Sequence, residues 1–501
     1  MIKLGSTAVI LILLIRTGTG QVNWPTDSNN SFPWIADSVN HMNNFYDFDG
    51  NPASLFEDET SKQLWIGHVS DYYDGAFHHP FEPKSLYNQR YFVQTSYPID
   101  ENDLFKGFFT YTRQNDRDVM WADQTRNLDW NPYIFADSST GDFELSGLSW
   151  AGEWAHRLSS NWLAGATFYY NVDQRLKQVF PKPLNSHRDI VTKIGTQYRA
   201  GNMSFAAHYQ YLDEQEQVEI TKYNLNQDLT PLIYKFRYSD LPLILRGKTS
   251  DERKSELSTH QLNIQGRWKN NVWNVLFAGC FGKTTGNTID GGNRNDEQGK
   301  LERTSIGSKL KVERDWVRTK VSFSYGFQQN KLNANHPDFN LETIQHPSTR
   351  HSAQLGLINK LSIKTSIFGE VKFHWLQNQY EDRMTANYWK YDQQQWGGKA
   401  GIIRSLGKHW TGTLWGGYSQ YSYSDLLTQE TIYTEYFNIL FRDNLNYLTG
   451  GEDDFYLGSK IVYHFLPVFE AELNTYWYQI NSTNSDRKNF YADLMVKIYI
   501  F

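Results

Sequence analysis

The sequence predicts an all-β protein: a transmembrane antiparallel up-and-down β-barrel of about 18 strands, with short periplasmic turns and long extracellular loops. Three observations predict it. Apolar and polar residues alternate with a period of two over many segments long enough to cross a bilayer. Tight turns alternate along the chain with longer polar loops. Aromatic residues make up 16% of the chain, and its 17 Trp and 32 Tyr suit a membrane–water interface.

The first twenty residues have the composition of a cleaved secretory signal. Lys3 precedes the apolar run 8–15, and the small residues Gly18 and Gly20 stand just before Gln21. We therefore expect a signal peptide over 1–20 and an exported mature protein.

Residues 21–60 show no sustained alternation and precede the first expected strand. We interpret them as a short N-terminal segment that is periplasmic or plugs the barrel, which itself spans 61–501. Within this segment, Asn51, Pro52 and Ala53 form a tripeptide that is similar to one in the long-chain fatty-acid transporter family. The alternative interpretation is an ordinary turn, which Asn-Pro favours.

The alternation then gives the strands one after another. The expected ranges are 62–73, 86–98, 103–114, 142–157, 161–174, 188–200, 202–214, 258–269, 271–284, 303–314, 316–329, 348–361, 362–377, 392–406, 409–423, 453–465, 467–480 and 488–501. Several of the short connections, such as Gly201-Asn202 and Asn270-Asn271, have the composition of tight turns. An even number of strands returns both ends of the chain to the same side of the membrane.

Each strand has one apolar and one polar face. In 316–329, Val321, Phe323 and Tyr325 alternate with Lys320 and Ser322, so the apolar side is expected to meet lipid and the polar side to line the lumen. The residues expected to line the lumen are Arg318, Lys320, Lys364, Glu370, Lys372, His374, Glu470 and Glu472.

The last strand ends the chain at Phe501. Phe490, Leu494 and Val496 share its apolar face. An apolar final strand with a terminal Phe resembles the last strand of bacterial outer-membrane barrels. That resemblance implies outer-membrane lipid as surroundings and recognition of this strand by the barrel-assembly machinery.

Three long loops stand out, at 115–141, 215–257 and 424–452. In the second, the alternation over 232–238 indicates that the strands continue above the membrane. In the third, apolar residues recur at intervals of three and four, which predicts a short amphipathic helix. The expected gating residues of that helix are Tyr433, Phe437, Leu440 and Phe441. The alternative is a helix that only packs on neighbouring loops.

No catalytic or metal-binding motif is visible, and no cofactor is expected. His78 and His79 lie near carboxylates, but adjacent residues on a strand point to opposite faces and so suit a single ion poorly. Cys280, the single cysteine, is interpreted as a small residue on a strand.

Composition excludes one other class of protein, the helical membrane proteins, and gives no support to a second, the nucleic-acid-binding proteins. No apolar run long enough for a membrane helix follows the N-terminus, and the mean hydropathy is −0.63. The formal net charge of −6 gives no indication of a nucleic-acid partner.

The segment Asn51 to Ala53, the strand 64–71 and residues 108–113 followed by Trp121 resemble a family of outer-membrane β-barrels of unknown function. The family is found in Bacteroidota-type bacteria and is often encoded beside TonB-dependent receptors. The resemblance implies the outer membrane of a Gram-negative cell and a role in solute uptake, as a channel or as an accessory to such a receptor. A TonB-dependent receptor itself is not expected, because the segment before the barrel is too short for its plug domain.

Two alternatives remain open on the sequence alone. One is an outer-membrane enzyme with a site at the extracellular rim, which a convergent set of titratable residues there would reveal. The other is a hydrophobic transporter like the fatty-acid transporters.

Overall fold

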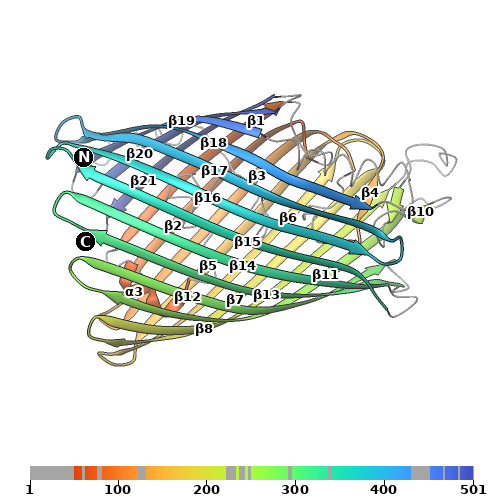
Figure 1. The fold of residues 1–501 in the computed structure, drawn as a ribbon, viewed down its shortest axis with the longest axis horizontal. Helices are drawn as coiled ribbons and strands as arrows, with labels where there is room; N and C mark the ends of the chain where they lie inside the picture. The colour runs from red at the N-terminus through yellow and green to blue at the C-terminus, as the bar shows by residue number, and fades with distance from the viewer. Residues whose placement is uncertain are drawn as a thin grey trace, which may run out of the picture.

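The wall of the molecule is one antiparallel sheet of 18 strands that closes on itself (Figure 1). The computed structural model describes residues 50–58, 62–75, 82–121, 131–221, 233–235, 243–245, 250–291, 296–336, 341–429, 452–466, 469–482 and 486–499. The first strand pairs with the second and with the last, and the closing register joins Gln63 to Tyr499. The predicted all-β barrel is confirmed.

The wall strands are β1 (Gln63–Gly75), β2 (Ser85–Pro98), β3 (Asp103–Val119), β5 (Gly141–Arg157), β6 (Trp162–Lys177), β7 (Lys182–Ala200), β8 (Met203–Thr221), β11 (Ser250–Lys269), β12 (Trp273–Asp290), β13 (Asp296–Asp315), β14 (Thr319–His336), β15 (Leu341–Lys360), β16 (Thr365–Asp382), β17 (Asn387–Ser405), β18 (Trp410–Gln429), β19 (Glu452–Leu466), β20 (Phe469–Ser482) and β21 (Asp486–Tyr499). Each corresponds to one expected strand, in the same order.

Several strands are longer than the sequence predicted, always at the long-loop end. The expected strand 188–200 is β7, which begins at Lys182, and the expected strand 258–269 is β11, which begins at Ser250. Outward positions there carry ion pairs such as Lys283–Glu302, at 2.9 Å and half exposed. Because these outer positions are polar, the apolar/polar alternation fades although the strands continue to pair.

The short turns lie at the end of the barrel where the first strand begins and the last strand ends. Between β7 and β8 the turn is Gly201-Asn202, as expected, and Gly201 has a φ of +58°, a left-handed conformation that glycine adopts without strain. The C-terminal Phe501 lies outside the described residues.

The outer face of the wall carries two belts of aromatic side chains. Near the short turns, Trp162 packs on Tyr198 and Trp410 on Tyr463. Farther along, Tyr418 packs on Phe455. Trp410 and Tyr418 lie on the same tilted strand and are separated by roughly 20 Å along the barrel axis. That spacing and the exposed aliphatic residues between the belts match the apolar band of a membrane barrel.

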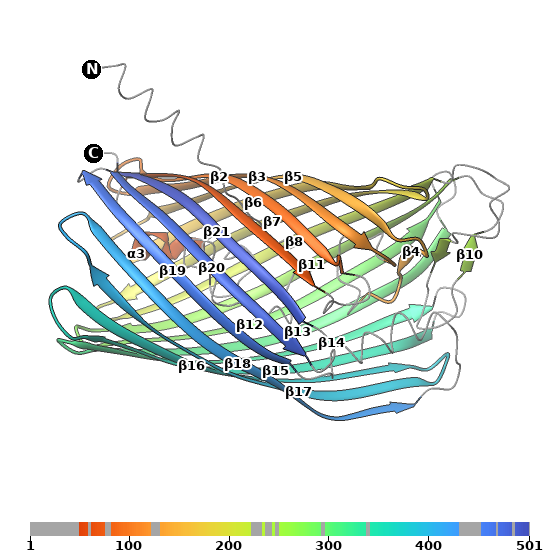
Figure 2. The same cartoon turned by 90° about the horizontal axis from the view of Figure 1, so that it is seen from above.

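Two further elements lie inside the wall. At the short-turn end are a 3-10 helix, η1 (Pro52–Ser54), and one helical turn, α3 (Leu55–Asp58). At the opposite end is a small sheet of β4 (Phe135–Asp137), β9 (Ile233–Lys235) and β10 (Leu243–Leu245). Figure 2 shows the two at opposite ends of the barrel. No helix among the described residues is long and apolar enough to cross a membrane.

Candidate functional site: the lumenal plug

A small sheet joins two loops that are far apart in the sequence. β4 belongs to the connection between β3 and β5, whereas β9 and β10 belong to the connection between β8 and β11. β4 and β10 both pair with β9, and Phe135 lies opposite Lys235. We call residues 131–140 together with β9 the lumenal plug. The pairing makes one body from the two loops.

The plug is packed as tightly as a protein core. Tyr133, Phe135 and Asp137 are each at most 1% exposed. Phe135 and Ile233 form an apolar cluster with Val218 and Ile220 of β8. Burial of this extent means that the plug lies against the inner face of the wall.

Tyr133 is the apolar anchor of the plug. Its ring lies over Gly299 of β13, where any side chain would overlap it. Its hydroxyl donates to the carbonyl oxygen of Asn335, 2.7 Å away, and lies 3.0 Å from that of Lys300. Burial raises the pKa of the Tyr133 phenol, so the hydroxyl stays protonated and able to donate.

The inner wall around Tyr133 is apolar and aromatic. Tyr380 and Trp389 stack with ring centroids 5.3 Å apart, and Trp389 also stacks on Tyr391. With Tyr133 these rings form one cluster whose other members are Leu257, Leu301, Leu332, Ala334 and Ile344. The ring of Tyr133 therefore packs into an apolar region of the wall.

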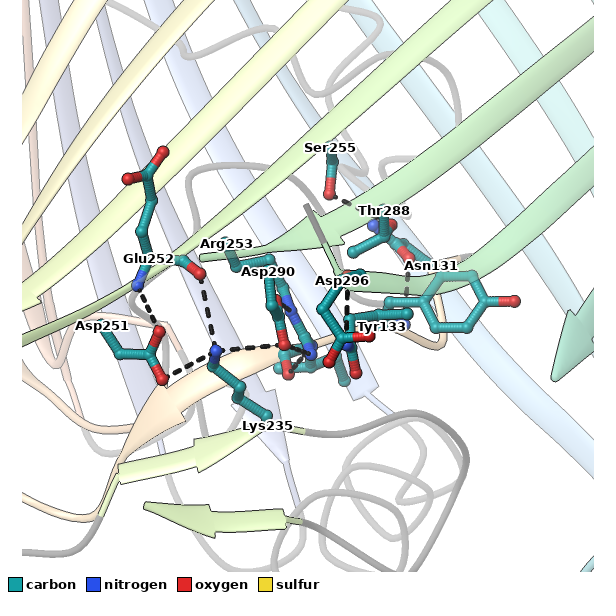
Figure 3. Close-up of polar contacts among 12 residues, drawn as sticks. Asn131, Tyr133, Lys235, Asp251, Glu252, Arg253, Ser255, Thr288, Asp290 and Asp296 are labelled. Carbon is teal, nitrogen blue, oxygen red and sulfur yellow. Dashed lines mark hydrogen bonds and ion pairs between the residues drawn. The ribbon is translucent and has the colours of Figure 1, made fainter. Parts of the chain in front are cut away.

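Lys235 is the ionic anchor of the plug (Figure 3). Its ammonium lies 2.8 Å from Asp251 Oδ2 and 3.0 Å from Asp290 Oδ2. These carboxylates come from β11 and β12 of the wall, and all three side chains are at most 6% exposed. A charge buried in this way is stable only while its partners stay in place.

Arg253 of β11 extends the same network. Its Nε lies 2.7 Å from Asp290 Oδ1, and its guanidinium donates to the carbonyl oxygen of Ile134 at 2.8 Å. Asp290 therefore pairs with a cation from the wall and with a cation from the plug. This arrangement links the position of Ile134 to the position of Lys235.

A separate ion pair holds the other edge of the plug. Lys177 of β6 contacts both carboxylate oxygens of Asp137 at 2.9 Å and the carbonyl oxygen of Ser139 at 2.7 Å. The side chains of Lys177 and Asp137 are essentially unexposed. The plug is thus attached to the wall at two places, at β6 and at β11–β14, with β7 and β8 between them.

The short-turn end of the lumen holds the segment that contains Asn51. The Asn51 amide donates to the carbonyl oxygens of Thr196 and Ala207, both at 3.2 Å, and its side-chain oxygen caps η1 by accepting from Ala53 N. Residues 51–58 form η1 and α3, and Asn51 holds them against the inner face of β7 and β8. That this segment plugs the barrel stays a prediction. Of the expected segment 21–60, residues 21–49 and 59–60 lie outside the described residues.

Gly165 provides the space for this segment, which gives a test. A Cβ at Gly165 would lie 2.5 Å from the backbone of Pro52 and Ala53. Gly165→Val should therefore displace residues 51–54 and expose the amides of Ala53 and Ser54 to hydrogen exchange. Gly266→Val is the control, because no atom lies nearer than 4.0 Å to its Cβ. Equal protection of these two amides in both variants would contradict the packing of residues 51–54 against Gly165.

The residues expected to line the lumen fall into two groups. Six lie in wall strands, at positions on the inner face of the barrel: Lys320, Glu370, Lys372, His374, Glu470 and Glu472. Lys320 lies 3.6 Å from Glu313, and Glu472 lies 2.6 Å from Lys460. Glu470 pairs with His464 at 3.1 Å. Whether they line a transport pathway stays a prediction.

Arg318 and Lys364 were expected on strands, and the structure places both in exposed turns. The turns 316–318 and 361–364 connect β13 to β14 and β15 to β16. Val317 and Ile363, in the same turns, are fully exposed. The apolar/polar alternation of the sequence runs on through the turn residues, which is why the expected strands began too early.

The expected gating residues Tyr433, Phe437, Leu440 and Phe441 lie outside the described residues, as do His78 and His79. Within 232–238, only residues 233–235 are described. They form β9 of the plug, so this stretch is not part of the wall, although the wall strands β8 and β11 do extend into the expected loop 215–257. β8 ends at Thr221 and β11 begins at Ser250.

Sequence reasoning missed Tyr133, Arg253 and Asp290. All three lie outside the strands expected from the alternation, in stretches taken for polar loops, where a charged residue is ordinary. The one available signal was the alternation around Lys235. It indicated a strand, but it did not show that this strand lies in the lumen. Among the described residues, no three His, Cys, Asp or Glu side chains are grouped as a metal site would require.

Comparison with known proteins gives one family and several distant structures. A family model described as a family of unknown function (DUF6850) matches residues 52–500. No curated protein matches the sequence.

Three solved structures illustrate the similarity. The ferripyoverdine receptor of the outer membrane of Pseudomonas aeruginosa has a TM-score of 0.42 and 9% identity, over 87% of this chain and 72% of that one. The copper transporter OprC has 0.43 and 8%, over 88% and 82%. The ferric preacinetobactin receptor BauA of Acinetobacter baumannii has 0.38 and 10%, over 87% and 80%.

Proposed function

The chain belongs to a family of unknown function (DUF6850), and from its geometry we propose that it is an outer-membrane barrel for solute uptake whose outer mouth is closed by the lumenal plug. In this proposal a solute passes through the lumen only after the plug leaves the wall. The single observation that carries the proposal is the buried attachment of Lys235 to Asp251 and Asp290.

The membrane location is supported by the outer face. Aromatic belts separated by roughly 20 Å enclose exposed residues such as Leu414 and Ile367. We propose the outer membrane of a Gram-negative cell, where closed antiparallel barrels of this kind reside, with the short turns in the periplasm.

A gated barrel fits the plug better than an open pore does. Eighteen strands enclose a lumen wide enough for an aqueous channel unless it is filled. Here the plug fills part of the end that carries the long loops, and residues 50–58 occupy part of the other end. A permanently open pore has no use for three buried ion pairs between a loop and its own wall.

Those ion pairs also suit an element that has to move. Buried charges contribute little net stability compared with apolar packing of the same volume, but they specify one position. Water that enters when the plug moves would solvate Lys235, Asp251 and Asp290, so the separated state is not prohibitively costly. We propose a TonB-dependent receptor as the candidate partner in uptake.

Conductance across a planar bilayer tests the proposal. The wild-type protein should show little current, and Lys235→Met combined with Lys177→Met should raise the open fraction, because both ionic attachments of the plug are lost. Lys254→Met combined with Lys283→Met is the matched control, since it removes two cations from exposed ion pairs. Equal currents from all three proteins would refute the gating role of the plug.

A further inference from the structure

One row of the inner wall alternates aromatic side chains with glycines. The row crosses β16–β20 at one height of the barrel, and residues directly opposite each other on antiparallel strands point to the same side of a sheet. Its members, in strand order, are Phe368, Gly401, Trp415, Gly458 and Tyr476. Each of them has a chain neighbour that is exposed on the outer face, as Leu414 is beside Trp415. The row therefore faces the lumen, and we call it the aromatic strip.

The glycines of the strip make room for the rings to lie along the wall. A Cβ at Gly458 would lie 2.4 Å from two atoms of the Trp415 ring, and a Cβ at Gly401 would lie 2.6 Å from Phe368 Cζ. Each ring therefore extends sideways over the glycine of the next strand, with one face toward the wall and the other toward the lumen. Both rings are partly exposed. The strip thus presents aromatic faces to whatever enters the lumen.

The apolar surface continues at both ends of the strip. Tyr476 packs on Tyr456, with ring centroids 6.1 Å apart, and on Tyr478, at 6.4 Å. At the other end, Ile358 of β15 lies opposite Phe368 on the inner face and is nevertheless 40% exposed. No other part of the described chain therefore covers this end of the strip.

Polar side chains border the strip above and below. Two residues nearer the long loops, Glu370 of β16 pairs with Lys399 of β17 at 3.3 Å. Two residues nearer the short turns, Lys460 of β19 lies 2.6 Å from Glu472, and its side chain is 32% exposed. These two polar rows are separated by four residues along the strands, roughly 13 Å. A band with these borders suits a solute that is apolar on one face and polar at its edges.

A carbohydrate has this combination of surfaces. One face of a pyranose ring presents C–H groups that pack on an aromatic face, and the hydroxyls around its edge hydrogen-bond to carboxylates and ammonium groups. A wholly apolar solute would remove water from Lys399 and Lys460 without replacing its hydrogen bonds. A wholly polar solute would gain nothing from the rings.

The spacing of the rings indicates several sugar units. Phe368 and Trp415 are two strands apart, roughly 10 Å between backbones, and Trp415 and Tyr476 are separated by the same interval. One pyranose ring covers one such side chain, so a single sugar leaves most of the strip uncovered. An oligosaccharide that runs across the strands contacts all three rings.

We propose that the aromatic strip binds a neutral oligosaccharide, stacked on Phe368 and Trp415 with its hydroxyls toward the polar borders. The proposal rests on the proposed uptake function, because it names the class of solute that the lumen takes. Trp415 lies between Trp410 and Tyr418, which belong to the two aromatic belts on the same strand. The solute is therefore held within the membrane-spanning part of the lumen.

Equilibrium dialysis of the full-length protein tests the strip, in an amine-oxide detergent because that headgroup contains no sugar. The probes are maltohexaose, laminarihexaose and mannohexaose, with indole as the aromatic reference. Phe368→Leu combined with Trp415→Leu should weaken oligosaccharide binding by on the order of tenfold, because both stacking faces are lost while apolar side chains remain. Dialysis reaches equilibrium even when the plug opens rarely, so the plug is left intact.

The matched control removes the same two residue types from the lipid side. Phe373 and Trp396 pack on each other on the outer face, with ring centroids 4.3 Å apart, and Trp396 is 54% exposed. Phe373→Leu combined with Trp396→Leu should bind as the wild type does. Trp415→Phe keeps a flat ring in the strip and should lose affinity only a few-fold, by roughly the smaller stacking area.

The outcomes decide the proposal. Binding of at least one hexasaccharide that weakens in the strip variant and not in the control supports it. Equal affinities in the wild type and the strip variant, an equal loss in the control, no binding of any hexasaccharide by the wild type, or binding of indole alone would overturn it. If the double variant does not fold, Phe368→Leu alone replaces it, with a loss of a few-fold expected.

Failure of the strip and failure of the uptake function give different results. Oligosaccharide binding by a protein whose conductance does not respond to plug release would refute gated uptake and leave the strip intact. Conductance that responds to plug release without any oligosaccharide binding would do the reverse.

Discussion

Asp290→Ala should destabilise the lumenal plug by about 3–5 kcal/mol, because it removes the carboxylate that pairs with both Lys235 and Arg253. The Arg253 side chain is completely buried, and the uncompensated charge cannot reach water unless the plug moves. Hydrogen exchange at the amides of 133–137 measures the loss directly. Urea unfolding of the whole barrel should change less, since the wall strands keep their pairing.

The control for this prediction is a variant of an ion pair that is exposed to solvent, Lys283–Glu302. Lys283→Ala removes a partner of Glu302 on the outer face, where both side chains are half exposed, and should cost only about 0–1 kcal/mol. Equal exchange at 133–137 in wild type and Asp290→Ala would show that the network does not hold the plug.

Leu355→Arg should destabilise the folded barrel in lipid by about 2–4 kcal/mol, because Leu355 lies on the outer face between the two aromatic belts. Its neighbour Gln354 faces the lumen, opposite Lys372. Gln354→Arg should therefore have a much smaller effect on stability, although it introduces the same side chain one residue away. Urea titration of both variants in lipid vesicles gives the two free energies.

The comparison also checks which face of β15 meets lipid. Adjacent residues on a strand point to opposite sides, so an error in the assigned faces would reverse the two results. Similar losses in both variants would mean that β15 does not separate lipid from lumen.

The barrel could be predicted from sequence because its wall obeys one local rule. Where one face meets lipid, residues such as Phe323 and Tyr325 must alternate with polar partners, and this alternation located all eighteen wall strands. The apolar/polar alternation is no longer required where the strands extend beyond the membrane. There both faces of β7 and β11 are polar, and the expected strands stopped short.

The plug could not be predicted because its residues satisfy no local pattern. Asp290 is buried only because Lys235, distant in sequence, comes to lie beside it. Tyr133 needs Gly299 on another strand to make room for its ring. Such pairs form because the loops fold back into the lumen. Contacts between residues that are distant in the chain leave no periodic pattern in a single sequence. In the turns, the alternation predicted strand where there is none: Arg318 and Lys364 continue the alternation but do not belong to a strand.

The central claim is that the plug closes the outer mouth of the lumen, and the single cysteine of the chain tests it most directly. Cys280 lies on β12 between Ala278, which is fully buried, and the lumen-facing Gly282, whereas Phe277 and Phe281 are exposed on the outer face. The measurement is the rate at which a membrane-impermeant maleimide labels Cys280 on intact cells that lack general porins. Slow labelling of the wild type and fast labelling of the Lys177→Met, Lys235→Met variant are the predicted result; equally fast labelling of both would contradict the account.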